Sequence, residues 1–173
     1  MAAATKIILI PKSPWEEGRW GKREKQDWFR GCVLAAEIAQ KENGTIIVPT
    51  SFTRKGQDES ALYQVALIEL DVRNAKFPRE GNETIAQIDA CARIVQDPNV
   101  NLVIVSTFSH WPRVYWLTFG IPRCRRRIAW GIPRPLELFT DIIFGALFPI
   151  IDICGGRDWF QRKVSARREK GKF

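Results

Sequence analysis

The chemistry of this chain is concentrated in one segment, Val105-Ser-Thr-Phe-Ser-His-Trp-Pro-Arg113. It holds the only histidine of the sequence, His110. An imidazole with its ordinary pKa of about 6.5 acts as a general acid, as a general base or as a hydrogen-bond donor to an anion. Arg113 follows three residues later, where one helical turn brings it to the same face as the histidine, and a guanidinium binds phosphate or carboxylate. The segment therefore predicts an anion site, with His110 as the catalytic residue.

The position of this segment between a strand and a helix supports that prediction. The apolar run 102–105 predicts a buried strand, and residues 112–119 predict a short helix that ends at Gly120. The hydroxyls of Thr107 and Ser109 are then expected at the carboxyl edge of a sheet, where open α/β sheets bind their ligands. The amino end of the following helix also favours an anion.

Polar residues at other predicted boundaries complete the candidate site. Thr50 and Ser51 follow a predicted strand, and Glu59 opens a predicted helix, where the helix dipole alone already favours a carboxylate. The candidate ligand-binding residues are Thr50, Ser51, Glu59, Glu80, Asn82, Thr84, Thr107, Ser109 and Arg113. Each has a structural alternative as a cap, a turn residue or half of an ion pair, and Arg113 has Glu59 and Glu80 as alternative partners. The residues alone leave both interpretations open.

Predicted strands and helices alternate along the chain. The predicted strands span residues 6–10, 45–48, 74–77, 102–105 and 128–130, and the predicted helices span residues 24–43, 59–70, 83–96, 112–119 and 136–153, with a charged loop at 52–58. Such alternation is typical of βαβ units. We therefore expect an α/β fold, a Rossmann-like three-layer sandwich with a mainly parallel sheet. Residues 1–156 suit a single domain, and residues 157–173 form a basic tail whose composition predicts disorder from Lys163 onward.

Positive charge is concentrated in the C-terminal third. The chain holds 27 Lys and Arg against 19 Asp and Glu, a net charge of +8, and residues 123–173 carry 12 of these bases but 5 of the acids. Such an asymmetry favours docking on nucleic acid or on an anionic membrane, although a solvated basic tail has the same composition. The apolar stretch 136–153 contains three acids and Pro149. These residues argue against a membrane-spanning helix, and we expect a helix packed on the sheet.

The remaining sequence features narrow the class of protein. The four cysteines are widely spaced, and with a single histidine they offer no metal site. They indicate reduced thiols in a cytoplasmic protein. The arginines beside the last apolar stretch leave peripheral contact with a membrane open as an alternative. The first apolar run, 7–10, is too short for a signal peptide. The sequence has no P-loop, no Gly-x-Ser-x-Gly elbow and no zinc motif, so it does not decide whether the protein is an enzyme.

The order of these segments resembles the YdcF/SanA/ElyC family over residues 6–155. The residues that match the family's motifs are Thr107, His110 and Arg113 of a Ser/Thr-x-x-His-x-x-Arg element, and Glu80, Asn82 and Thr84 of an acidic loop with the helix after it. The resemblance implies a Rossmann-like domain of undefined activity with a polar pocket at the strand ends. It also implies S-adenosylmethionine as a candidate ligand.

The chain departs from the family pattern at two places in that pocket. Pro49-Thr-Ser-Phe52 stands where the family has a Ser-Gly-Gly turn, and Thr84-Ile-Ala-Gln87 stands where it has Thr-x-Glu-Asn. Ligand identity therefore does not carry over. The leading hypothesis is a YdcF-like domain that binds a nucleotide-like or phosphorylated small molecule, with chemistry assisted by His110. The alternative is a non-enzymatic module that docks on nucleic acid or anionic lipid through its basic C-terminal third.

Overall fold

A five-stranded, fully parallel sheet forms the centre of the molecule. The computed structural model describes residues 4–12, 14–15, 21–50, 53–54, 56–79, 84–94, 97, 99–131 and 135–169. The strands lie in the order β5-β2-β1-β6-β7. Their bounds are Ala4–Leu9 for β1, Thr45–Ile47 for β2, Ala75–Lys76 for β5, Val100–Thr107 for β6 and Cys124–Ala129 for β7. The expected strand at 128–130 therefore begins four residues earlier, inside the arginine-rich run.

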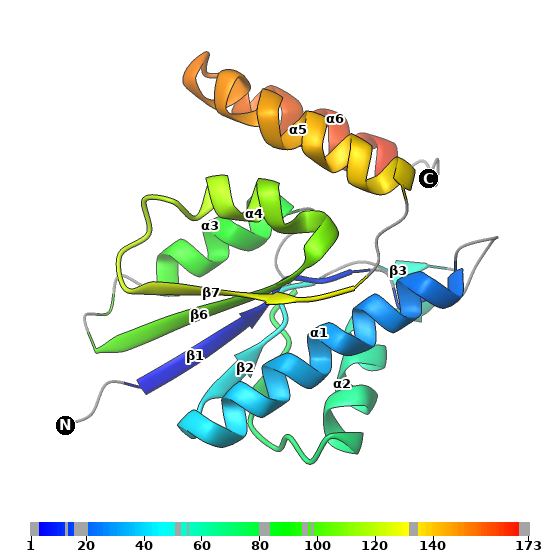
Figure 1. The fold of residues 1–173 in the computed structure, drawn as a ribbon, viewed down its shortest axis with the longest axis vertical. Coiled ribbons are helices and arrows are strands. Elements are labelled where there is room, and N and C mark those ends of the chain that lie inside the picture. The colour runs from blue at the N-terminus through cyan, green and yellow to red at the C-terminus, as the bar shows by residue number, and fades with distance from the viewer. Residues whose placement is uncertain are drawn as a thin grey trace.

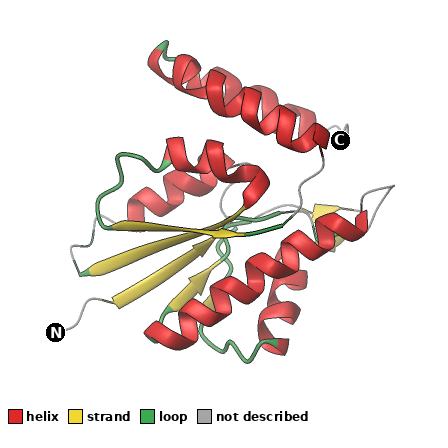
Figure 2. Cartoon of the chain, in the orientation of Figure 1, coloured by secondary structure: helices red, strands yellow, loops and turns green. Residues whose placement is uncertain are grey.

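Helices cover both faces of this sheet. Helices α1 (Gly21–Glu42) and α2 (Glu59–Glu69) lie on one face, and α3 (Thr84–Ile94) and α4 (Trp111–Leu117) lie on the other (Figure 1). Coloured by secondary structure, the sheet is seen between the two helical layers (Figure 2). The chain is thus an α/β protein of the Rossmann-like, three-layer kind, as the alternation of elements predicts.

The two central strands are buried on both faces, which explains their near-continuous apolar sequences. Ile7 and Leu9 of β1 point into the core shared with α1 and α2, whereas Ile8 belongs to the core shared with α3 and α4. In β6, Val103 and Ile104 divide between the two cores in the same way. Because Leu9 pairs with Val105 in parallel register, the carboxyl ends of β1 and β6 lie side by side.

The structure defines the buried face of α2 and corrects the loop predicted before it. On α2, Tyr63 and Leu67 are buried, whereas Val65 is 56 % exposed. This helix is apolar on several faces, so the spacing of its apolar residues does not select one. The charged loop expected at 52–58 contains a small antiparallel hairpin of β3 (Thr53–Arg54) and β4 (Gln57–Asp58).

The C-terminal third forms two further helices, α5 (Pro135–Ile153) and α6 (Arg157–Glu169). The apolar stretch is helical as expected, but α5 packs on α4 rather than on the sheet, because α3 and α4 already cover that face (Figure 1). A helix also runs through Lys163, where the composition predicts disorder. None of the helices in the described part of the chain combines the length and apolar character needed to cross a bilayer.

Candidate functional site

The candidate site lies where the strand order reverses. From β1 the chain proceeds to β2 and β5 on one side, whereas β6 and β7 extend the sheet on the other side of β1. In open α/β sheets, ligands bind beyond the carboxyl ends of the strands at this switch point. Three buried polar residues follow the strands there, namely Lys12 after β1, Thr50 after β2 and Ser109 after β6.

Lys12 joins the two sides of the switch point. Its Nζ donates a hydrogen bond to the hydroxyl of Ser109 over 3.0 Å and forms an ion pair with Asp27 of α1 over 3.5 Å. The Lys12 and Asp27 side chains are only 4 % and 8 % exposed. Ser109 in turn shares a hydrogen bond of 3.3 Å with Thr107. Buried charges persist in proteins when they are paired and hydrogen-bonded, and this cluster meets both conditions.

A second cation and a close backbone approach complete the surroundings of Asp27. Arg30 Nη1 lies 3.1 Å from its Oδ1, so the cluster of Lys12, Asp27 and Arg30 carries one net positive charge. A Cβ built on Gly131, which follows β7, would lie 2.1 Å from the same oxygen. The chain leaving β7 therefore passes directly against this carboxylate, and only glycine fits there without a shift.

Thr50, Glu59 and Tyr63 form a second buried cluster between β2 and α2. The Thr50 hydroxyl donates to a carboxylate oxygen of Glu59. The Tyr63 hydroxyl accepts a hydrogen bond from the Lys12 backbone N–H over 2.7 Å and donates to the Lys12 carbonyl over 3.0 Å. Burial, with the nearby charge of Glu59, raises the pKa of Tyr63 well above its ordinary value. The neutral phenol thus fixes the backbone that presents the lysine.

The start of α2 explains how Glu59 reaches this position. Asp58 is the N-cap, and its Oδ1 accepts hydrogen bonds from the backbone N–H and the hydroxyl of Ser60 over 3.0 Å and 2.9 Å. These bonds, with Arg79 at 2.8 Å, hold the pKa of Asp58 below its ordinary value. The cap fixes where the helix begins, so it also places Glu59 opposite Thr50.

His110 and Arg113 form the half-buried part of the site. Arg113 Nη2 lies 3.3 Å from His110 Nδ1, as their spacing of one helical turn predicts. Because a guanidinium only donates hydrogen bonds, Nδ1 is the acceptor, and the proton of the neutral imidazole lies on Nε2. His110 occupies the N-cap position of α4, but its side chain makes no capping hydrogen bond. The geometry therefore assigns this ring a role other than capping the helix.

The structure brings six of the predicted residues together in three pairs: Thr107 with Ser109, Thr50 with Glu59, and His110 with Arg113. Thr84 is buried at the start of α3. Within the described ranges no hydrogen bond joins it to the other candidates. Ser51, Glu80 and Asn82 lie outside the described residues.

Sequence reasoning missed Lys12, Asp27 and Tyr63. Lys12 carries the same signal as the predicted residues, since it is a polar side chain directly after a strand. Asp27 lies on α1 one helical turn before Gly31 and two turns before Ala35, both of which are buried, so an acid occupies the inward face. An acidic residue on the buried face of a helix indicates that a cation or hydrogen-bond donor is buried with it. Tyr63 gives no comparable signal, because a buried tyrosine is ordinary core.

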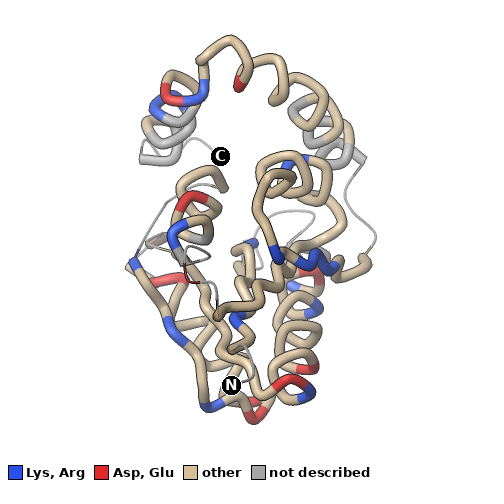
Figure 3. Tube along the Cα trace, turned by 90° about the vertical axis from the view of Figure 1, so that its left-hand side faces the viewer, with Lys and Arg blue, Asp and Glu red and all other residues tan. Residues whose placement is uncertain are grey.

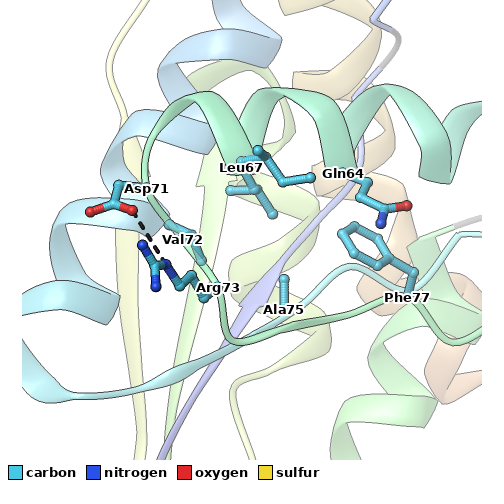
Figure 4. Close-up of a pocket in the computed structure, with 8 residues that line it drawn as sticks. Gln64, Leu67, Asp71, Val72, Arg73, Ala75 and Phe77 are labelled. Atoms are coloured by element: carbon cyan, nitrogen blue, oxygen red, sulfur yellow. Dashed lines mark ion pairs between the residues drawn. The ribbon is translucent and has the colours of Figure 1, made fainter.

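A cavity of about 430 Å³ lies elsewhere, at the edge of the sheet beside β5. Leu67 and Gln64 of α2 line one side, and Ala75 and Phe77 line the other (Figure 4). The ion pair near its end involves Arg73, which is 94 % exposed. None of the predicted site residues lines this cavity, so it is separate from the strand-end site.

Neither a metal site among the described residues nor a known relative assigns the site more specifically. No group of three or more His, Cys, Asp or Glu side chains in the described ranges could hold a metal ion. Comparison of the chain with protein-family models, with curated proteins and with solved structures found no significant match. The fold and the site thus define a Rossmann-like α/β domain with a buried polar cluster at its switch point.

Proposed function

We propose that this chain is a YdcF-like domain that binds a nucleotide-like or phosphorylated small molecule beyond the carboxyl ends of β1 and β6. One observation carries the proposal, namely the 3.0 Å hydrogen bond between Lys12 and Ser109. It joins a buried cation on one side of the switch point to hydroxyl groups on the other. This bond fixes hydroxyl groups beyond the carboxyl ends of the strands, where open α/β sheets bind ligands, and the half-buried Arg113 supplies the charge that an anionic ligand requires.

His110 and Arg113 supply the part of the site that a ligand meets from solvent. Both side chains are partly exposed, unlike Lys12. The guanidinium binds a phosphate or carboxylate group, and the Nε2–H of His110 donates to the same anion. A neutral imidazole with its proton on Nε2 donates a hydrogen bond to an oxygen that gains negative charge, so the site is compatible with His-assisted catalysis. S-adenosylmethionine remains a candidate on the resemblance alone.

Isothermal calorimetry against nucleotides, nucleotide sugars, sugar phosphates and S-adenosylmethionine tests this function. Arg113→Ala removes one charge-assisted contact, so we expect a binding loss of about 1.5–3 kcal/mol with the fold intact. His110→Ala should weaken binding of the same ligand. Arg73→Ala, at the separate cavity, is the matched control and should leave affinity unchanged. If all three variants bound the ligand as tightly as wild type, the strand-end site would not be the binding site. If only Arg73→Ala lost affinity, the ligand would bind in the cavity beside β5.

A second candidate function uses the basic C-terminal third. Arg162 and Lys163 are exposed on α6, and Arg127 is exposed on β7. The predicted basic tail is thus partly an ordered helix, which presents its charges on a fixed surface. This arrangement supports docking on nucleic acid or on anionic lipid, and binding to either should weaken with added salt.

A further inference from the structure

Among the described side chains of α5, one face exposes apolar residues from Phe139 to Ile153. Phe139, Ile142, Ile150 and Ile153 are 61 %, 51 %, 59 % and 80 % exposed. Ile143 and Leu147 add to the same face at 39 % and 45 %. The helix has 19 residues and is about 28 Å long, and the described side chains of this face carry no charge. Contiguous exposed apolar surface of this size marks an interaction site.

The opposite side of α5 already has its partners. Phe148 is fully buried, and its ring lies edge-to-face on Phe160 of α6 at 5.2 Å. A Cβ on Gly145 would lie 2.8 Å from Pro112, so α5 and α4 are in close contact. Arg157, at the start of α6, pairs with Asp89 of α3 over 2.6 Å. These contacts hold the α5–α6 pair on α3 and α4, so a rotation that buried the apolar face would break them.

The charges and aromatic residues beside this face indicate its occupant. Trp159 of α6 is 57 % exposed and is followed by the exposed cations Arg162 and Lys163. In Figure 3 the described part of α5 is almost free of charge, whereas α6 carries both basic and acidic positions. An exposed apolar helix face followed in the chain by a helix with an exposed tryptophan and exposed basic residues has the composition that binds the interface of an anionic bilayer.

The other two occupants fit less well. Nucleic acid would use the cations and leave the apolar face of α5 in water. A second copy of the chain would cover that face, but the same basic α6 on both copies offers no charge complementarity. An anionic lipid surface satisfies both features at once, because acyl chains meet the apolar side chains and headgroups meet the cations.

We propose that the α5–α6 pair lies in the plane of an anionic lipid surface, with the exposed face of α5 buried among the lipids. Neither helix crosses the bilayer in this arrangement. The proposal uses no residue of the strand-end site, so it goes beyond the small-molecule function and stands independently of it. It also fixes the orientation of the domain, since α3 and α4 lie between the lipid surface and the sheet.

Vesicle flotation of the full chain tests the proposal. The vesicles contain either phosphatidylcholine alone or an equimolar mixture with phosphatidylglycerol. The variant Ile142→Glu/Ile150→Glu places two charges on the face that would enter the lipid. The matched control Val65→Glu/Ile68→Glu changes two equally exposed apolar residues on α2, which are 56 % and 63 % exposed. All four positions are at least half exposed, so both variants should keep the wild-type circular dichroism spectrum.

We expect wild type to float with the anionic vesicles. The α5 variant should partition to them at least about tenfold less, because burial of each isoleucine side chain in the lipid contributes strongly to the free energy of binding. The α2 control should bind like wild type. Replacing Arg162 and Lys163 by Gln should weaken binding about fivefold for each charge. Equal binding of wild type and the α5 variant overturns the proposal, as does equal binding to neutral and anionic vesicles.

Two further measurements separate the competing occupants. Light scattering after size exclusion reports whether the chain is dimeric. A dimer that the α5 variant dissociates, without vesicle binding by wild type, would assign the face to self-association and refute the proposal. Electrophoretic retardation of short duplex DNA that is unaffected by the α5 variant, again without vesicle binding, would assign the C-terminal third to nucleic acid.

Discussion

The buried ion pair of Lys12 and Asp27 permits a quantitative test of how the site is built. At the observed separation of 3.5 Å, two unit charges attract by about 5 kcal/mol if the effective dielectric constant is about 20. Removing both charges from water offsets much of that gain. Removing one charge alone is worse, because the other stays buried without its partner, and losses of about 3–5 kcal/mol are typical.

For Lys12→Met we expect a loss in unfolding free energy near the lower end of that range, about 3 kcal/mol. Arg30 remains 3.1 Å from Asp27 after the substitution and compensates part of the buried charge. Asp27→Asn should cost a similar amount, because it removes the carboxylate that pairs with the buried ammonium of Lys12. The double variant should cost less than the sum of the two, with a coupling of about 1–3 kcal/mol.

Urea unfolding of the four proteins in this double-mutant cycle measures the coupling. The exposed pair of Asp71 and Arg73 is the control, since its side chains are 83 % and 94 % exposed and its atoms are 3.7 Å apart. A cycle there should give a coupling below about 1 kcal/mol. Additive losses at Lys12 and Asp27, or a Lys12→Met loss no larger than the exposed control, would refute the argument that burial makes this pair structural.

Three further predictions follow from single residues. Burial raises the pKa of the Cys32 thiol to about 12, so iodoacetamide at mildly alkaline pH should modify the exposed Cys154 and spare Cys32 until urea is added. Peptide mass spectrometry measures the modification of both cysteines, and rapid modification of Cys32 in the folded protein would contradict this prediction. Asp58→Ala should cost about 1 kcal/mol near neutral pH. Because the folded pKa of Asp58 is lowered, its ionised form stabilises the fold above the ordinary pKa, and urea titrations should show that contribution vanishing as pH falls through the lowered value. Gly131→Ala should destabilise by about 1–3 kcal/mol in thermal unfolding, whereas Gly120→Ala, which meets open space, should change little; equal effects would contradict the close approach at Gly131.

The sequence predicts the central strands because a strand buried on both faces is apolar throughout, and β6 fits that description. It places the start of β7 wrongly because Arg125, Arg126 and Arg127 indicate a basic surface rather than a strand. An edge strand tolerates such residues when alternate side chains find partners on either side. Arg125 pairs with Glu42 of α1, and Arg126 donates to Thr118 beyond α4. Those partners are visible only after the chain has folded.

The same distinction separates the predicted site residues from the missed ones. His110 and Arg113 are three residues apart, so helical geometry alone brings them together. The hydrogen bond between Lys12 and Ser109 spans 97 positions of the sequence and depends on the parallel pairing of β1 with β6. No local spacing reports a contact of that kind. A rule that collects every polar residue directly after a predicted strand would have included Lys12.

The charges of the site divide it into two parts with different energetic roles. Lys12 is compensated by Asp27 in the folded protein, so an incoming anion gains little from it unless that pair rearranges. Arg113 and His110 are partly exposed, so a ligand reaches them from solvent. Substitution of Lys12 should therefore lower the free energy of unfolding more than it weakens ligand binding. Substitution of Arg113 should weaken ligand binding more than it lowers the free energy of unfolding. A Lys12 variant that kept its stability but lost ligand binding would show instead that the anion displaces Asp27 and binds inside the buried cluster.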